Sequence, residues 1–106
     1  MPKYLMHANY VGDGIKGLLK DGGSSRREAA TQAITSLGGK VEAFYYAFGD
    51  TDVYMIVEMP DNATMAGAAL KVSASGLVTV RTTVLMTPEE VDQAAKKTPK
   101  YRPPGQ

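Results

Sequence analysis

The chain has 106 residues, 43% of them hydrophobic, and a formal net charge of +1, a composition typical of one ordinary globular domain. It has no cysteine, which excludes a disulfide framework, a thiolate metal site and a cysteine nucleophile. No signal-peptide pattern and no run of roughly 20 apolar residues is present, so we expect a cytoplasmic protein without a membrane partner.

Charge is unevenly distributed along the sequence. Residues 96–106 carry a charge of +4 and three prolines, whereas residues 1–95 carry −3. We expect residues 1–95 to form the folded domain and residues 96–106 to be a basic, proline-rich tail. A mildly acidic body is a poor platform for nucleic acid, so we expect no nucleic-acid partner.

The first third of the sequence predicts a strand followed by a helical arm. Apolar and polar residues alternate over 3–10, as in a strand with one buried face. Apolar residues then recur at helical spacing over 12–37, with a break at the glycine pair 22–23. Ser25 and Glu28 have the spacing of a capping box, which predicts that the second helical segment starts at Ser25.

The middle of the sequence predicts a β-hairpin. Two segments rich in aromatic and apolar residues, 41–48 and 53–59, flank the turn-forming residues 49–52. Two registers are open, and they place Phe44, Tyr46 and Phe48 of the first strand on one face with different residues of the second strand. These partners are either Tyr54 and Ile56 or Val53, Met55 and Val57.

The remaining sequence predicts a helix over 63–73, a strand over 77–86 and a short helix that starts with a capping box at 87–90. The expected inward residues of the first of these helices are Met65, Ala66, Ala69, Leu70 and Val72. The order β-α-β-β-α-β with a further short helix is the ferredoxin-like α+β plan. Its four-stranded antiparallel sheet has both main helices on one face.

The other face of that sheet is bare, and it also carries large apolar side chains. Monomers rarely leave such a face exposed to water. We therefore expect the open sheet face to pair with a second copy of the chain, forming a homodimer.

Three blocks of sequence carry a family resemblance: residues 17–27 (GLLKDGGSSRR), 36–45 (SLGGKVEAFY) and 46–52 (YAFGDTD). With these blocks the chain resembles the GYD-domain family of small bacterial proteins over about residues 3–90. Thr51 stands where the tyrosine of the family's Gly, Tyr and Asp would be. The resemblance implies a dimeric α/β-barrel fold, and it implies no particular activity.

Two candidate catalytic residues are His7 and Asp52. His7 is the only histidine, and so the only side chain whose ordinary pKa lies near neutrality. One histidine lacks the companions that a metal site needs, so we expect no metal. Asp52 follows Asp50 at the hairpin tip, where aspartate is also selected simply to bond the turn backbone.

A candidate ligand site lies at the break in the helical arm. Glycines and hydroxyl side chains at a helix start expose backbone N–H groups to an anion. Two arginines in the first turn oppose the helix dipole, and an anionic ligand would explain them. The proposed site consists of Gly22, Gly23, Ser25, Arg26 and Arg27; the alternative is a kink followed by a cap.

Three functions remain open from the sequence. The first is a small-molecule binding domain, with an anion as a candidate ligand. The second is a cofactor-independent oxygenase or isomerase, as in the wider set of dimeric α/β barrels, and the third is an assembly component. The dense tyrosines and phenylalanines are candidates to line an aromatic pocket between sheet and helices. No Walker or dinucleotide motif is present, so we expect no cofactor.

Overall fold

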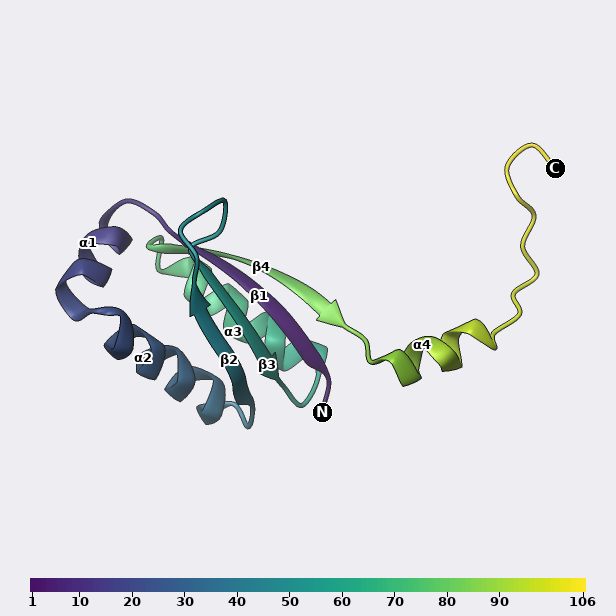
Figure 1. Cartoon of the computed structure of the whole chain (residues 1–106), viewed down its shortest axis with the longest axis horizontal. Coiled ribbons are helices and arrows are strands. Elements are labelled where there is room, and N and C mark those ends of the chain that lie inside the picture. Colours follow the sequence, from purple (N-terminus) through teal and green to yellow (C-terminus); the bar gives the residue numbers. More distant parts are fainter.

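The computed structural model describes residues 1–106 and has eight helices and strands in one chain (Figure 1). In chain order they are β1 (Lys3–Tyr10), α1 (Asp13–Asp21), α2 (Gly23–Ser36), β2 (Lys40–Tyr46), β3 (Val53–Glu58), α3 (Asn62–Ala74), β4 (Val78–Leu85) and α4 (Pro88–Ala95). The predicted ferredoxin-like α+β fold is confirmed, including the glycine break that divides the helical arm into α1 and α2.

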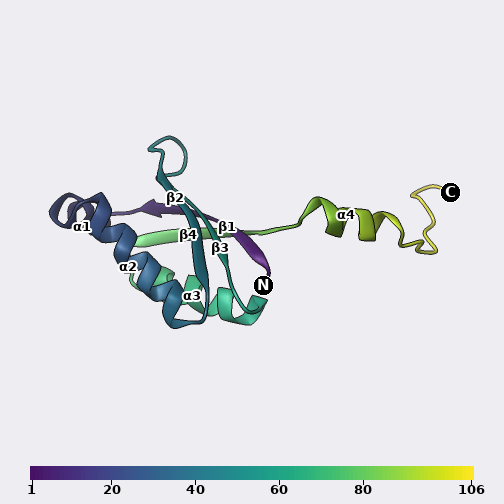
Figure 2. The ribbon, with the colours of Figure 1, turned by 60° about the horizontal axis from the view of Figure 1, so that its bottom comes forward.

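The four strands form one antiparallel sheet in the order β2-β3-β1-β4, with α2 and α3 on the same side of it (Figure 2). The hairpin register is also settled: Phe44 pairs with Met55 and Tyr46 with Val53. Neighbouring residues in register point to the same face, so Phe44 and Tyr46 face the helices with Met55 and Val53, whereas Tyr45 and Tyr54 are on the other face. The other face has no helix on it.

Two expectations about the helices were wrong in detail. Helix α2 begins at Gly23, with Gly22 as its N-cap and no side-chain cap, so Ser25 lies inside the first turn and forms no capping box. Gly22 has a φ of 85°, which lets the chain turn sharply between α1 and α2, and this backbone break replaces the cap. In α3 the buried residues are Met65 and Ala68, whereas the predicted inward residues Ala66 and Leu70 are exposed.

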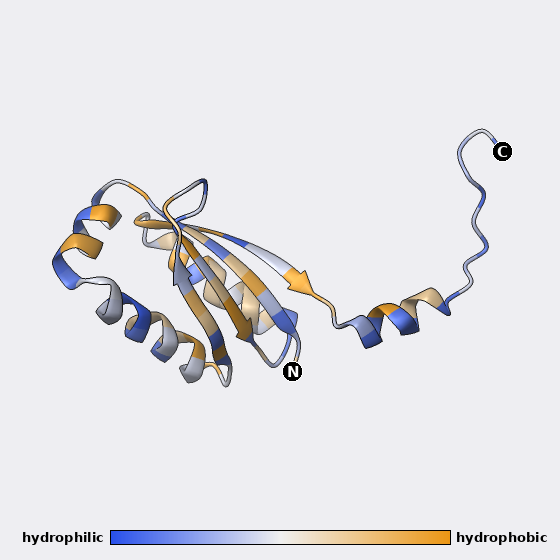
Figure 3. Cartoon of the chain, viewed as in Figure 1, coloured by the Kyte–Doolittle hydropathy of each residue, from blue (hydrophilic) through white to orange (hydrophobic).

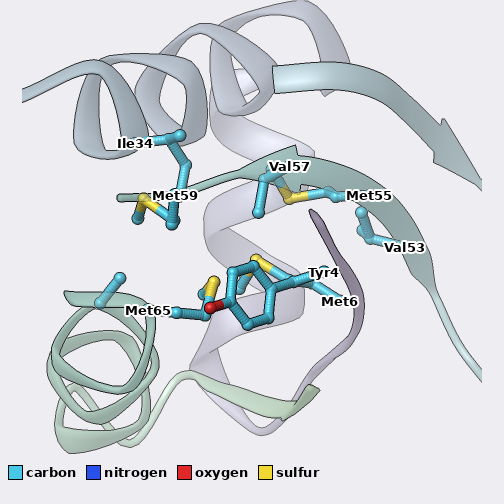
Figure 4. Packing of buried hydrophobic residues seen from close by; sticks show 9 residues of the cluster. Tyr4, Met6, Ile34, Val53, Met55, Val57, Met59 and Met65 are labelled. Carbon is cyan, nitrogen blue, oxygen red and sulfur yellow. The ribbon is translucent and has the colours of Figure 1, made fainter. Parts of the chain in front are cut away.

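The core lies between the sheet and the helices and is rich in methionine (Figure 4). Its nine buried residues come from β1, α2, β3, α3 and the β3–α3 connection, and they are Tyr4, Met6, Ile34, Val53, Met55, Val57, Met59, Met65 and Ala68. The Tyr4 hydroxyl donates a hydrogen bond to Asn62 at the start of α3, where the Asp61 side chain caps the helix through the N–H of Thr64. These contacts fix α3 beneath β1 and β3.

Helix α4 lies away from this body, at the end of an arm that continues β4 (Figure 1). The chain has a radius of gyration of 17.0 Å, whereas a compact chain of this length has about 13 Å. The predicted capping box is present at Thr87 and Glu90. None of the four helices is long and apolar enough to cross a membrane.

Candidate functional site

A cavity of about 660 Å³ lies between α2, α3 and the helix-facing side of the sheet. Twenty residues line it, and fifteen of them are hydrophobic. Its floor is formed by strand residues that include Met6, Ala8, Phe44, Met55 and Val80. A cavity of this volume and composition is in the range of small-molecule binding sites.

The cavity exists because the helices turn small residues toward it. Helix α2 contributes Ala29, Ala30 and Ala33, and α3 contributes Gly67 and Ala68. Helix α2 packs mainly on β2, whereas α3 packs mainly on β4, which leaves the two helices apart over the middle of the sheet. The cavity is therefore open to solvent between the two helices, and several of its lining residues, among them Ala33 and Gly67, are exposed.

The only charged side chains that line the cavity are cationic. They are Arg26 from the first turns of α2 and Lys71 from the last turn of α3, and no aspartate or glutamate joins them. Arg26 is part-buried and its nearest carboxylate belongs to Asp21, at 3.8 Å between Nη1 and Oδ2. The guanidinium therefore has hydrogen-bond donors left for a ligand.

Tyr46 and Tyr10 lie beside Arg26 at this end of the sheet. The Tyr46 hydroxyl donates a hydrogen bond of 3.0 Å to the carbonyl oxygen of Gly23, and its ring occupies the space that a side chain at Gly23 would need. Burial and the neighbouring Tyr10 hydroxyl raise the pKa of Tyr46 to about 12. Tyr46 is therefore a neutral hydrogen-bonding group at physiological pH.

A second, smaller hollow of about 280 Å³ adjoins the first and lies under α1. The two share four lining residues: Tyr10, Arg26, Val72 and Val78. Asp21 and Ser75 line only the smaller one. Arg26 thus stands between an apolar compartment and a more polar one.

Of the five residues of the predicted ligand site, only one lies at the cavity. Arg26 lines both hollows, whereas Gly22, Gly23, Ser25 and Arg27 line neither. The first helical turn of α2 contains exposed Ser25, and Arg27 is likewise exposed. The Asp21 carboxylate lies beside Arg26 and already gives this arginine a partner within the protein.

Neither His7 nor Asp52 lines the cavity, although the Asp52 backbone N–H bonds to the carbonyl oxygen of Ala8, next to His7 in β1. His7 is on the open face of the sheet, with its ring edge-on to Tyr54 at 5.0 Å between centroids and its Nδ1 buried without a hydrogen-bond partner. The Asp52 carboxylate accepts the backbone N–H of Tyr10 at 2.9 Å. No three His, Asp or Glu side chains lie close enough together to hold a metal ion.

Sequence reasoning offered a pocket between sheet and helices lined by tyrosines and phenylalanines, and of these residues only Tyr10 and Phe44 line the cavity. It missed Lys71 and the alanine-lined surface of α2. The helical spacing of Ala30, Ala33, Ile34 and Leu37 predicted the inward face of α2 only in part: Ile34 is buried and Ala30 half-buried, whereas Ala33 and Leu37 are exposed, although all four line the cavity. What it did not indicate was that such small side chains would leave space instead of close contact. The signal available was the shortage of large residues on the inward faces of both helices.

Taken together, the fold and site define a small ferredoxin-like α+β domain with a hollow between its sheet and its helices. The chain belongs to the GYD domain family, whose sequence profile matches residues 4–95. No curated protein and no solved structure matches it.

Proposed function

We propose that this protein binds a small, mainly apolar molecule with one anionic group in the cavity between α2, α3 and the sheet. The observation that carries the proposal is the lining of that cavity. Fifteen hydrophobic residues surround it, and its only charges are the cations Arg26 and Lys71. An apolar body would be driven in by burial, and a carboxylate or similar group would bond to the guanidinium.

The character of the walls supports an aromatic or otherwise bulky ligand. Met6 and Met55 contribute flexible, polarizable thioethers, and Phe44 contributes a ring. Such side chains adapt to irregular shapes, and methionine sulfur packs well against aromatic rings. The ligand would enter between α2 and α3, with its anionic end toward Arg26.

Binding without catalysis has more support than an enzyme acting through His7 and Asp52. Those two residues lie outside the cavity, and Asp52 is occupied by the Tyr10 N–H. A general base must reach the proton that it removes within about 3 Å or through one water. His7 faces the other side of the sheet, and the Asp52 carboxylate is engaged in a bond to the backbone, so neither is placed to act on a ligand in the cavity.

We also propose that two copies of the protein form a homodimer through the open faces of their sheets. Leu5 and Ile56 are direct neighbours at the centre of that face, and Tyr54 and Tyr45 extend it toward β2. Tyr45 is 71% exposed and Tyr54 38% exposed. A second copy would cover these rings, and two-fold pairing requires only one self-complementary surface.

The proposed ligand chemistry is tested with a matched pair of probes, 2-naphthoate and neutral 2-naphthamide, titrated by calorimetry. We expect the wild-type protein to bind the carboxylate about tenfold more tightly than the amide, because a charge-assisted bond to Arg26 adds to the same apolar burial. Arg26→Gln should remove that preference while leaving amide binding unchanged. Arg27→Gln, a neighbouring exposed arginine outside the cavity, should retain it.

Equal affinity for the two probes in the wild type would contradict the anionic part of the proposal. Absence of binding by both, at concentrations that saturate ordinary naphthalene-binding pockets, would contradict the cavity as a ligand site. Turnover of a bound probe in air would instead support the oxygenase alternative.

A further inference from the structure

The helices that wall the cavity, α2 and α3, run in opposite directions (Figure 1). Arg26 in the first turns of α2 and Val72 in the last turn of α3 both line the smaller hollow, so these two helix ends lie together. At the other end, Gly38 just after α2 lies beside Pro60 just before α3, where a Cβ atom at Gly38 would be 3.6 Å from Cγ of Pro60. The cavity between the helices therefore has two distinct ends.

The two ends differ in charge. Both cations of the cavity, Arg26 and Lys71, lie at the end formed by the start of α2 and the last turn of α3, which we call the head end. The opposite tail end is lined by Ile34, Leu37 and Thr64, none of them charged. Figure 3 shows the same change along α2, whose early turns are hydrophilic and whose last residues are hydrophobic. The cavity thus has a cationic end and an uncharged end.

The length between the two ends follows from helix geometry. The cavity is lined by residues 26–37, in and just after α2, and by residues 64–72 of α3. At about 1.5 Å per residue, these stretches are about 16 Å and about 12 Å long. An extended alkyl chain advances about 1.25 Å per carbon, given a C–C bond of about 1.5 Å and an angle of about 111°. Roughly ten to thirteen carbons therefore span the distance from head end to tail end.

We propose that the ligand is a straight-chain carboxylic acid of the fatty-acid kind, with its carboxylate bonded to Arg26 beside Lys71 and its chain extended to the tail end. This inference rests on the proposed function and narrows its ligand class. Asp21, 3.8 Å from Arg26, offsets one of the two cationic charges, so a single negative charge on the ligand neutralises the head end. A second carboxylate at the far end of the chain would lie among uncharged residues, where an unpaired charge is costly.

Calorimetric titration of the full chain with n-alkanoates of six to sixteen carbons, below the concentrations at which they form micelles, tests the inference. Affinity should rise about two- to fourfold for each added methylene, because each one is buried against the apolar walls. The rise should stop at roughly ten to thirteen carbons, where the cavity ends. The 1-alkanols of the same lengths should show the same rise with weaker binding throughout, because they lack the charge that Arg26 bonds.

Two pairs of variants separate the tail end from the head end. Thr64→Leu should weaken dodecanoate about tenfold and leave hexanoate unchanged, because only the longer chain reaches this position. Ala63→Leu, on an exposed neighbour outside the cavity, should bind every acid as wild type does. Lys71→Gln should weaken every acid about threefold and no alcohol. Lys20→Gln removes the same charge from an exposed site on α1 outside both hollows and should have no effect.

The outcomes distinguish this inference from the proposed function. An affinity that does not depend on chain length, or that rises without a stop to sixteen carbons, would overturn the straight-chain ligand. Equal weakening of hexanoate and dodecanoate by Thr64→Leu would overturn the assigned direction of the chain. Binding of 2-naphthoate with no binding of any alkanoate would overturn this inference and leave the proposed function standing. Absence of binding by both kinds of probe would contradict the two together.

Discussion

The carboxylate of Asp52 accepts the backbone N–H of Tyr10 at 2.9 Å, which joins the tip of the β2–β3 hairpin to the end of β1. The backbone N–H of Asp52 is in turn bonded to Asn9, whose side-chain oxygen accepts it at 2.8 Å. Thr51, beside it, is 2% exposed and accepts a bond from Arg81 of β4. The hairpin tip is thus a structural junction that positions Tyr10 at the mouth of the cavity.

This junction predicts different effects for the two aspartates of the tip. Asp52→Ala leaves the part-buried Tyr10 N–H without its acceptor and should lower the free energy of unfolding by about 1–3 kcal/mol. The exposed Asp50 side chain makes no such bond, and Asp50→Ala should change stability by less than about 0.5 kcal/mol. Urea unfolding of the two variants checks the difference, and equal losses would show that Asp52 has no special role.

The raised pKa of Tyr46 predicts that the stability of the folded protein falls at alkaline pH. Its pKa is raised to about 12 from an ordinary value of 10.0, so the folded state holds this proton more tightly than the unfolded chain. The stabilisation is complete below pH 10 and is lost as the pH rises toward 12. Subtracting the 295 nm absorbance titration of Tyr46→Phe from that of the wild type should leave a transition near pH 12, while circular dichroism reports that both are folded. A difference transition centred at 10.0 would refute the assignment.

Gly14 and Gly17, both in α1, differ in whether the surrounding structure has room for a side chain. A side chain at Gly14 would lie 2.0 Å from the carbonyl oxygen of Leu77, which also accepts the N–H of Val11 at 2.9 Å. Gly14→Ala should therefore destabilise the protein by about 1–3 kcal/mol. At Gly17 the same substitution meets nothing within 4 Å and should stabilise by about 0.5–1 kcal/mol. Thermal unfolding that ranks the two variants in the opposite order would contradict the packing of α1 against Leu77.

The fold was predictable because its signals are local. Alternation in β1, the helical spacing around Ile34 and the box at Thr87 each depend on a few neighbouring residues, and all three appear where expected. The start of α2 was misplaced because Ser25 and Glu28 have the right spacing, while the backbone turn at Gly22 decides where the helix begins. Leu70 was misassigned because α3 is apolar on several sides, so periodicity did not single out its inward face.

The site was less predictable, because a cavity depends on how far two helices stand from a sheet. Arg26 was recognised as a ligand candidate from its place at a helix start, and it does line the cavity. Lys71 lies 45 positions later in the chain, and nothing in the sequence relates the two before the helices are packed. The predicted roles of His7 and Asp52 as catalytic residues stay predictions.

The central claim is that the space between α2, α3 and the sheet is the ligand site, and filling that space tests it most directly. Ala33 lines the cavity, whereas Ala66 is exposed on α3 outside it. Ala33→Leu should weaken 2-naphthoate binding by about tenfold or more, and should change stability by less than about 0.5 kcal/mol because Ala33 is exposed on a helix surface. Ala66→Leu, the same chemical change outside the cavity, should bind as wild type does. Undiminished binding of 2-naphthoate by Ala33→Leu would contradict the assignment of the site.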